Sequence, residues 1–363
     1  MGKRLKKLCI CFLVVAVAQA DKNFLWIWVS AEGGHTCAIE RQKNKLFCWG
    51  DNSQEQVAPK EKISKVEKPK EILEGIIYVD TGGYHTCAIN SKNELFCWGN
   101  NWMGQIGNGT TSVSPLSPTK VMDDVSLVSL GGAHTCALKK KNKTLWCWGR
   151  GLDGQIGVGQ GIFPKPTLVM ADLVYVSSGW AHTCAIKEDR TLWCWGKNIY
   201  GQIGNLQFDT LSEGRKRENV LSPTKVLSGV KMVSCGGYHT CVIKEEDNSL
   251  WCWGDTRFGQ VKKSSAEYLP SPNLIMKDIA YVSAGGRHTC AVDLNNSLFC
   301  WGDNSFGQIG KFFDEKIIGE PVKVMDGVKI VSSGWDHTCA LKIDGNIICW
   351  GRNDKGQLGI FGN

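Results

Sequence analysis

The sequence predicts an all-β repeat protein of the propeller type, with one blade for each repeat. Its 363 residues contain seven copies of one motif, His-Thr-Cys followed by Cys-Trp-Gly. The copies use every histidine of the chain, at His35, His85, His134, His182, His239, His288 and His337. A period of about 50 residues is typical of solenoids and propellers. Each copy also divides into four short β-type runs separated by glycine or polar residues, which is the pattern of a four-stranded blade.

The last two runs of each copy are predicted to form a hairpin closed by a disulfide. The two cysteines of a copy are ten or eleven residues apart, which places them opposite each other when the intervening tip folds. The predicted pairs are Cys37 with Cys48, Cys87 with Cys97, Cys136 with Cys147, Cys184 with Cys194, Cys241 with Cys252, Cys290 with Cys300, and Cys339 with Cys349. The remaining cysteine of the repeat region, Cys235, is expected to be a free thiol that packs as a small residue.

Side-chain alternation indicates that both faces of this hairpin are covered. In the third copy, Cys136 and Cys147 lie on one face, while Trp146 and Trp148 lie on the other beside small residues. Both faces are largely apolar, so each needs a neighbouring blade. Stacking around a common axis supplies that cover.

The spacing of Gly-Gly-x-His-Thr, Trp-Gly, Gly-Gln-Ile-Gly and Pro-x-x-Val resembles the repeat of the regulator of chromosome condensation family. The resemblance covers about residues 24–363 and implies a seven-bladed β-propeller of about four antiparallel strands per blade. The paired cysteines resemble the cysteine-rich form found in exported, mostly bacterial, members. We expect one domain over residues 21–363, with approximate blades at 24–57, 69–107, 118–157, 164–204, 223–260, 272–310 and 321–359.

Two features depart from the regular repeat. Residues 54–57 and 259–262 replace the Gly-Gln-Ile-Gly turn. The first copy has no Pro-x-x-Val segment ahead of it, so we expect its blade to start one strand short and residues 360–363 to dock there and close the ring.

The N-terminus predicts export. Four cationic residues precede an apolar run over residues 8–17, and Ala18-Gln19-Ala20 offers a cleavage site, so residues 1–20 are interpreted as a signal peptide. The protein is therefore expected to be secreted or periplasmic after cleavage near Ala20. No later segment is apolar for long enough to predict a membrane span. Residues 21–363 carry 38 Lys and Arg against 35 Asp and Glu, which gives no electrostatic case for nucleic acid.

The repeated residues favour a structural role over chemistry. Each repeat offers only three His and Cys ligands in well-separated blades, so disulfides are expected and no metal or other cofactor. The copies place the same groups at the same positions, whereas an active site would break the symmetry. We expect no enzyme activity, and a histidine that forms a hydrogen bond across the tight Gly-Gly turn.

Residues that interrupt the repetition are the candidate binding site. Those immediately before the histidine are Trp180, Trp335, Tyr84, Tyr238, Arg287 and Asp336, and those near the Gly-Gln turn are Trp102, Tyr200, Phe258 and Phe306. Aromatic side chains on a rigid rim resemble the anchors of protein interfaces, although core packing is an alternative for some of them.

The predicted function is a secreted, non-enzymatic scaffold that binds a protein partner through one mouth of the propeller. A secreted propeller of this family that inhibits β-lactamases is the closest functional analogy. Two alternatives follow from the resemblance: guanine-nucleotide exchange or chromatin-type regulation, as in nuclear members, and tryptophan-based ultraviolet sensing, as in a plant photoreceptor. The ultraviolet alternative is weakened because Trp and Arg never coincide in the phrase before His-Thr.

Overall fold

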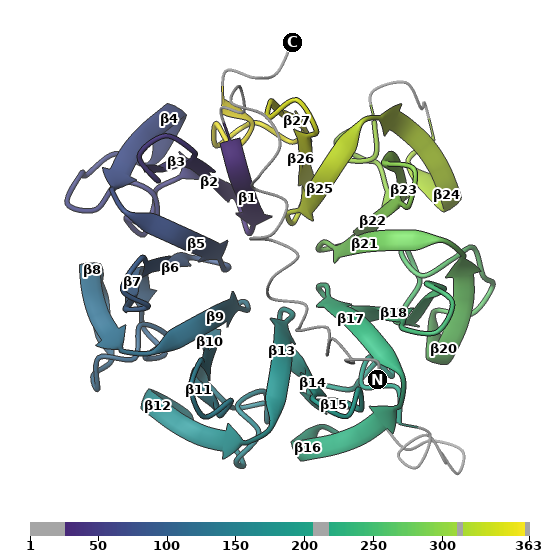
Figure 1. Ribbon diagram of the computed structural model, residues 1–363, viewed down its shortest axis with the longest axis horizontal. Coiled ribbons are helices and arrows are strands. Elements are labelled where there is room, and N and C mark those ends of the chain that lie inside the picture. The colour runs from purple at the N-terminus through teal and green to yellow at the C-terminus, as the bar shows by residue number, and fades with distance from the viewer. Residues whose placement is uncertain (1–25, 206–217, 311–314, 360–363) are drawn as a thin grey trace, which may run out of the picture.

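The computed structural model describes residues 26–205, 218–310 and 315–359, which form seven antiparallel sheets around a central axis (Figure 1). The predicted seven-bladed β-propeller is therefore confirmed. The predicted signal peptide and residues 360–363 lie outside the described residues.

Each sheet is one blade, and its strands follow one another along the chain. The first three blades are β1 Trp26–Glu32, β2 His35–Glu40, β3 Leu46–Asp51 and β4 Lys65–Leu73; β5 Ile76–Thr81, β6 His85–Asn90, β7 Leu95–Asn101 and β8 Ser112–Met122; and β9 Val125–Leu130, β10 His134–Lys139, β11 Leu145–Arg150 and β12 Ile162–Met170. The next two are β13 Leu173–Ser178, β14 His182–Lys187, β15 Leu192–Gly196 and β16 Val220–Leu227; and β17 Val230–Cys235, β18 His239–Lys244, β19 Leu250–Asp255 and β20 Tyr268–Met276. The last two are β21 Ile279–Ala284, β22 His288–Asp293, β23 Ser297–Asp303 and β24 Ile317–Asp326; and β25 Val328–Ser333, β26 His337–Lys342 and β27 Ile347–Gly351.

The first strand of each blade is the innermost. Neighbouring first strands contact one another in a closed sequence from β1 through β5, β9, β13, β17 and β21 to β25 and back to β1. They surround the centre of the ring in Figure 1. The fourth strand is the outer edge, and every such strand contains at least one proline. Proline has no N–H to offer a further strand, so it suits an edge that stays unpaired.

The grouping of strands differs from the predicted blade ranges. The Pro-x-x-Val run pairs with the Cys-Trp-Gly strand before it, as β4 pairs with β3. It is thus the last strand of one blade rather than the first of the next. The first blade is consequently complete, and among the described residues the seventh blade is the one with three strands.

The hairpin of β2 and β3 and its six equivalents hold the blade core. The seven disulfides join directly opposed residues with Cα–Cα distances of 4.1 Å, in the predicted pairs. The Cys-Trp-Gly indoles are buried, and each Nε1 donates a hydrogen bond to a backbone carbonyl of the preceding blade at 2.9–3.2 Å. Six of these carbonyls belong to the glutamine of the Gly-Gln turn or its equivalent. The exception is Trp301 of the sixth blade, which donates to the carbonyl of Val261 in the deviating turn of the fifth blade.

The ring closes without exchange of a strand in the described residues. At the junction between the seventh and first blades, Trp49 bonds to the Gln357 carbonyl, and the Ala31 N–H donates to Ser332 Oγ at 2.8 Å. The same kinds of bond join the other blades. Hydrogen bonds that involve both side chains and backbone therefore complete the circle.

Candidate functional site

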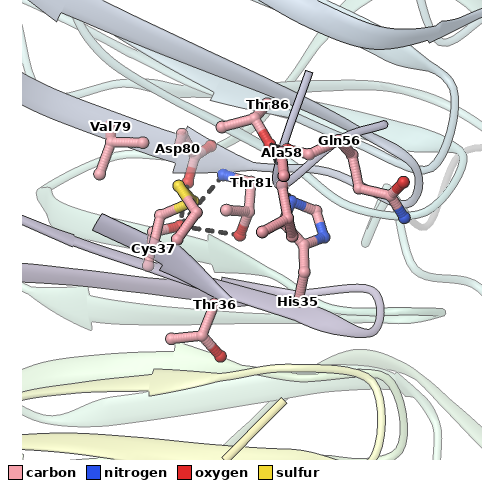
Figure 2. Close-up of a disulfide and its surroundings, with 12 residues drawn as sticks. His35, Thr36, Cys37, Gln56, Ala58, Val79, Asp80, Thr81 and Thr86 are labelled. Carbon is pink, nitrogen blue, oxygen red and sulfur yellow. Dashed lines mark hydrogen bonds between the residues drawn. A yellow bond between two sulfur atoms is a disulfide. The ribbon is translucent and has the colours of Figure 1, made fainter. Parts of the chain in front are cut away.

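The seven histidines form a belt that links each blade to the next. Each Nε2 lies 2.8–2.9 Å from the threonine Oγ1 of the following blade, and His337 bonds back to Thr36. Figure 2 shows His35 beside Thr86. Each threonine hydroxyl donates to a glutamine carbonyl, as Thr86 does to Gln56 at 2.7 Å, so it accepts from an Nε2–H. The predicted bond across the Gly-Gly turn is present in the backbone, where the carbonyl of the histidine accepts the glycine N–H three residues before it, for example from Gly131 to His134 at 2.9 Å. The imidazole itself reaches the neighbouring blade.

This belt leaves no histidine for acid–base chemistry. All seven imidazoles are fully buried, and burial lowers the pKa of each to about 3. In six blades the residue three before the histidine is a glycine, which gives the imidazole room, whereas the first blade has Glu32 there. A Cβ at Gly131 would lie 2.2 Å from His134 Cε1 and 2.4 Å from the Gly179 carbonyl.

A second belt joins the innermost strands. In each blade, a side-chain oxygen near the end of the first strand accepts an N–H from the next blade, at 2.8–3.1 Å. Six of these acceptors are serines and one is Asp80, which bonds to the Leu130 N–H and to Ser30 Oγ (Figure 2 shows Asp80 beside Thr81). Burial raises the pKa of Asp80 to about 7.

Cys235 is buried beside this inner belt and is the free cysteine of the described residues. Burial raises the pKa of its thiol to about 12, so the thiol stays protonated. It packs as a small residue. Among the described residues, no three His, Cys, Asp or Glu side chains are grouped to hold a metal ion.

One mouth of the propeller collects the turns that precede the histidines and the loops that follow Cys-Trp-Gly. Each loop is tied to its turn by a backbone hydrogen bond, for example from the Asn100 N–H to the Tyr84 carbonyl at 2.9 Å and from the Arg352 N–H to the Asp336 carbonyl at 2.9 Å. The candidate residues lie on these turns and loops. The scaffold therefore holds their backbones in fixed positions.

Trp180 and Trp335 meet across this mouth. They come from the fourth and seventh blades, and their ring centroids are 4.7 Å apart at an interplanar angle of 59°. Glycine makes room for both, since a Cβ at Gly132 would lie 2.8 Å from the Trp180 ring and one at Gly286 would lie 2.8 Å from the Trp335 ring. Both indoles are half-buried.

Arginines of the fifth to seventh blades each cover an aromatic ring on a loop of the preceding blade. Arg257 lies over Tyr200 at 4.3 Å from the ring centroid, Arg287 over Phe258 at 4.5 Å, and Arg352 over Phe306 at 4.8 Å. Tyr200 also packs edge-on against Tyr238 at 5.5 Å. Burial raises the pKa of Asp336, although Arg352 donates a hydrogen bond to this carboxylate at 3.2 Å and opposes the shift.

Two other predicted residues, Tyr84 and Trp102, line a hollow on the first to fourth blades. It has a volume of about 560 Å³ and is lined by Tyr84, Trp102 and Trp180 among others. Tyr84 and Trp102 are exposed, and Trp102 Nε1 donates to the Val113 carbonyl at 2.8 Å. A smaller hollow of about 200 Å³ lies between Trp180, Trp335 and Asp336.

Sequence reasoning did not identify three charged residues of the larger hollow, Arg150, Asp153 and Lys197, as binding residues. Arg150 forms an ion pair with Asp153, and Lys197 faces the Tyr238 ring at 5.7 Å. Arg150 and Lys197 follow the Trp-Gly step, where four of the other five repeats have Asp or Asn and the seventh has Arg352. Comparing that column between repeats would have found them.

Seven blades, a repeated hydrogen-bonded belt and a varied mouth define this protein as a β-propeller built from tandem repeats. Family models described as "Regulator of chromosome condensation (RCC1) repeat" match the chain. One matches residues 76–105, 125–155, 174–202, 230–260, 279–308 and 328–357, and the other matches residues 92–138, 144–186, 190–243 and 295–341. The chain therefore belongs to the RCC1 repeat family.

Solved structures share the fold at low sequence identity. The human WBSCR16 structure is 22% identical, with a TM-score of 0.76 over 89% of this chain and 88% of that one. Prp20p from Saccharomyces cerevisiae is 18% identical, with a TM-score of 0.74 over 92% of this chain and 84% of that one. Yeast RCC1 (Prp20) bound to Kap60 is 20% identical, with a TM-score of 0.76 over 99% and 87%. A search of curated protein sequences found no match.

Within the described residues, no helix is long and apolar enough to cross a membrane.

Proposed function

We propose that this protein is an exported, non-enzymatic scaffold that binds a protein partner through the mouth bearing Trp180 and Trp335. Inhibition of the bound partner is one outcome of such binding. The proposal rests on how the repeated and varied residues are divided. The repeated His, Thr, Cys and Trp are engaged in contacts within and between blades, whereas the varied aromatic and charged residues gather on one mouth.

The chemistry of the mouth fits recognition of a protein. Trp, Tyr and Arg are the residues most enriched in the energetic centres of protein interfaces. Here they are mounted on turns that are tied to the propeller by backbone hydrogen bonds, so little ordering accompanies binding.

Disulfides and relatives support this proposal. Seven disulfides suit an oxidising compartment, in agreement with the predicted signal peptide. Among propellers of similar fold, Prp20p has binding properties to Gsp1p and histones, and yeast RCC1 has been solved bound to Kap60. These partners are proteins. We infer that this chain shares with these propellers the binding of a protein, and not the particular partner.

The test is affinity capture from the native extracellular or periplasmic fluid with the disulfide-bonded protein as bait. Replacing Trp180 and Trp335 together by alanine should weaken capture by about 2 kcal/mol or more, because two clustered aromatic anchors are lost. The matched control replaces Ile77 and Ile343 by alanine. These residues are exposed, at 44% and 45%, and lie at the opposite mouth, where β5 begins and β26 ends.

Unchanged capture by the double tryptophan variant, with its fold intact by circular dichroism, would exclude this mouth. The nucleotide-exchange alternative is separated by measuring nucleotide release from a small GTPase. If the protein is a scaffold as proposed, it should not accelerate this nucleotide release. Intact mass of the exported protein under non-reducing conditions tests both cleavage near Ala20 and the loss of two hydrogens for each disulfide.

A further inference from the structure

The mouth is chemically divided into two halves. The third residue after each Trp-Gly step is apolar and exposed in three consecutive blades, where Trp102, Leu152 and Ile199 expose 54%, 45% and 40% of their surface. The equivalent residues elsewhere are polar or charged, namely Ser53, Arg257, Ser305 and Asp354. We call Trp102, Leu152 and Ile199 the apolar arc. It belongs to the second, third and fourth blades.

Neighbouring segments extend this apolar surface. Val113, which is 83% exposed, accepts the hydrogen bond from the Trp102 indole. Leu221 is 39% exposed, and its Cδ2 lies 2.7 Å from the position of a Cβ at Gly154, in the same loop as Leu152. The arc is therefore continuous with apolar side chains from two outer strands. Exposed apolar groups gathered on one side of a soluble protein indicate an interaction site.

The two halves also differ in how their aromatic faces are used. Arginines of the fifth to seventh blades lie over the rings of Tyr200, Phe258 and Phe306, which belong to the loops of the fourth to sixth blades, so Tyr200 lies at the boundary between the two halves. Trp102 and Tyr84, on the second blade, line the open hollow instead. A partner that needs apolar contact is thus better accommodated by the apolar arc than by the opposite half.

Charge selects the kind of segment that fits. The rim loops of the arc, residues 100–109, 150–165 and 197–205, contain three cationic residues, Arg150, Lys165 and Lys197, and one carboxylate, Asp153. Asp153 is already paired with Arg150. Lys197 lines the hollow beside Trp180 with its ammonium near the Tyr238 ring. Complementary charge therefore favours an acidic partner.

We propose that the apolar arc and its hollow take a protein segment in which apolar side chains stand next to a carboxylate. The apolar side chains pack on Trp102, Leu152 and Ile199, while the carboxylate pairs with Lys197. This inference rests on the proposed function and narrows it to one half of the mouth and to one chemistry of partner.

The experiment selects short random peptides from a displayed library against the disulfide-bonded protein. Selected peptides are then measured against Leu152→Ser/Ile199→Ser, which gives the arc the polar character of the first and sixth blades. They are also measured against Lys197→Gln. Phe306→Ser, at a candidate residue that is 48% exposed on the arginine-covered half, separates the arc from the rest of the mouth. The matched control is Ile343→Ser, because Ile343 is 45% exposed at the opposite mouth. Circular dichroism confirms that each variant is folded.

We expect the selected peptides to combine apolar residues with Asp or Glu. Their affinity should fall at least about tenfold for Leu152→Ser/Ile199→Ser, as for contacts near the centre of an interface. It should also fall, and lose salt dependence, for Lys197→Gln, and should be unchanged for Phe306→Ser.

Three results would overturn the inference. Peptides rich in Lys or Arg would contradict its charge, and full affinity for Leu152→Ser/Ile199→Ser would contradict its location. If binding were lost only in Phe306→Ser or in the double tryptophan variant, the mouth would remain the binding face and the arc would fail. If no peptide were enriched, or if every variant bound as the wild type does, both proposals would fail.

Discussion

Acid should unfold this propeller over a narrow pH range, because the histidine belt is folded only with neutral imidazoles. The folded pKa of each histidine is about 3, while an unfolded histidine titrates near 6.5. Below about pH 6.5 the unfolded chain therefore binds protons that the folded chain does not, so stability falls as pH falls. The stabilising effect is present at neutral pH and is lost as the pH drops from about 6.5 toward 3.

The magnitude follows from linkage. Between about pH 7.5 and pH 5, one such histidine lowers the free energy of unfolding by about 2 kcal/mol, and seven lower it by about 14 kcal/mol. Asp80 works in the opposite direction. Its folded pKa of about 7 lies above its unfolded value. Protonation of Asp80 in the folded protein therefore adds about 2 to 3 kcal/mol to the free energy of unfolding as the pH falls. Burial also raises the pKa of Glu32, which adds to this increase. The net loss is on the order of 10 kcal/mol, comparable with the whole stability of a typical domain.

Urea unfolding at a series of pH values, without reductant, measures this loss. The buried indoles give the fluorescence signal, and the pH slope of the unfolding free energy gives the number of protons taken up. We expect a net uptake of about five protons near pH 5.5, because the histidines take up about six and Asp80 releases about one on unfolding. A midpoint that stayed constant from neutral pH to about pH 5 would refute the neutral, buried belt. Imidazole signals in NMR spectra that titrated near pH 6.5 in the folded protein would do the same.

Three further predictions concern individual positions in the blades. Gly131→Ala should lower the free energy of unfolding by about 3 kcal/mol or more in thermal or urea unfolding, because its Cβ would meet His134 and a carbonyl. The control Gly75→Ala, at a position with a positive φ but no atom within 4 Å, should lower it by about 1 kcal/mol. Equal losses would contradict the packing argument. Asp80→Ser restores the serine of the inner belt, so its stability relative to the wild type should rise as pH increases through about 7, and a difference independent of pH would show that Asp80 is not buried as described. Replacing Cys136 and Cys147 together by alanine should lower the free energy of unfolding by about 3 kcal/mol under non-reducing conditions, while the same variant should match the reduced wild type at that hairpin in hydrogen exchange.

The hairpins could be predicted because covalent chemistry and alternation agree there. Cysteines ten or eleven residues apart allow one register, and the structure has Cys136 opposite Cys147. The glycines before His134 and its equivalents were recognised as a turn, but their role in making room for an imidazole was not. That role depends on a neighbouring blade, which one repeat does not contain.

The assignment of the Pro-x-x-Val strand to the wrong blade has a local cause. Only two residues, Glu74 and Gly75, separate β4 from β5, which resembles a hairpin, whereas thirteen separate β3 from its true partner β4. The short connection is instead the crossing from the outer edge of one blade to the inner strand of the next. At each of the six crossings a residue has positive φ, namely Gly75, Asp124, Asp172, Gly229, Asp278 and Gly327. Gly and Asp tolerate that conformation, so their presence was compatible with both interpretations.

The sequence predicted that the candidate residues lie on one mouth of the propeller, but it did not predict the difference between the two halves of that mouth. Trp180 and Trp335 were identified by their departure from glycine, yet their contact depends on the geometry of two distant blades. Leu152 and Ile199 were overlooked because they precede the column that was compared. Whether an aromatic ring is covered depends on the residue in the next blade, as Arg257 covers Tyr200.

The hydrogen bonds of the two belts also indicate which junction between blades is weakest against mechanical or thermal opening. Six junctions between blades are crossed by the polypeptide as well as by the bonds of the belts. Among the described residues, the junction between the seventh and first blades is held by non-covalent bonds alone. Covalently, the protein is a circle with one cut. Opening should begin at that cut, with the Ala31 amide exchanging its hydrogen before its counterparts in other blades. A permuted chain that joined this junction and opened another would move the weak point while keeping the same ring.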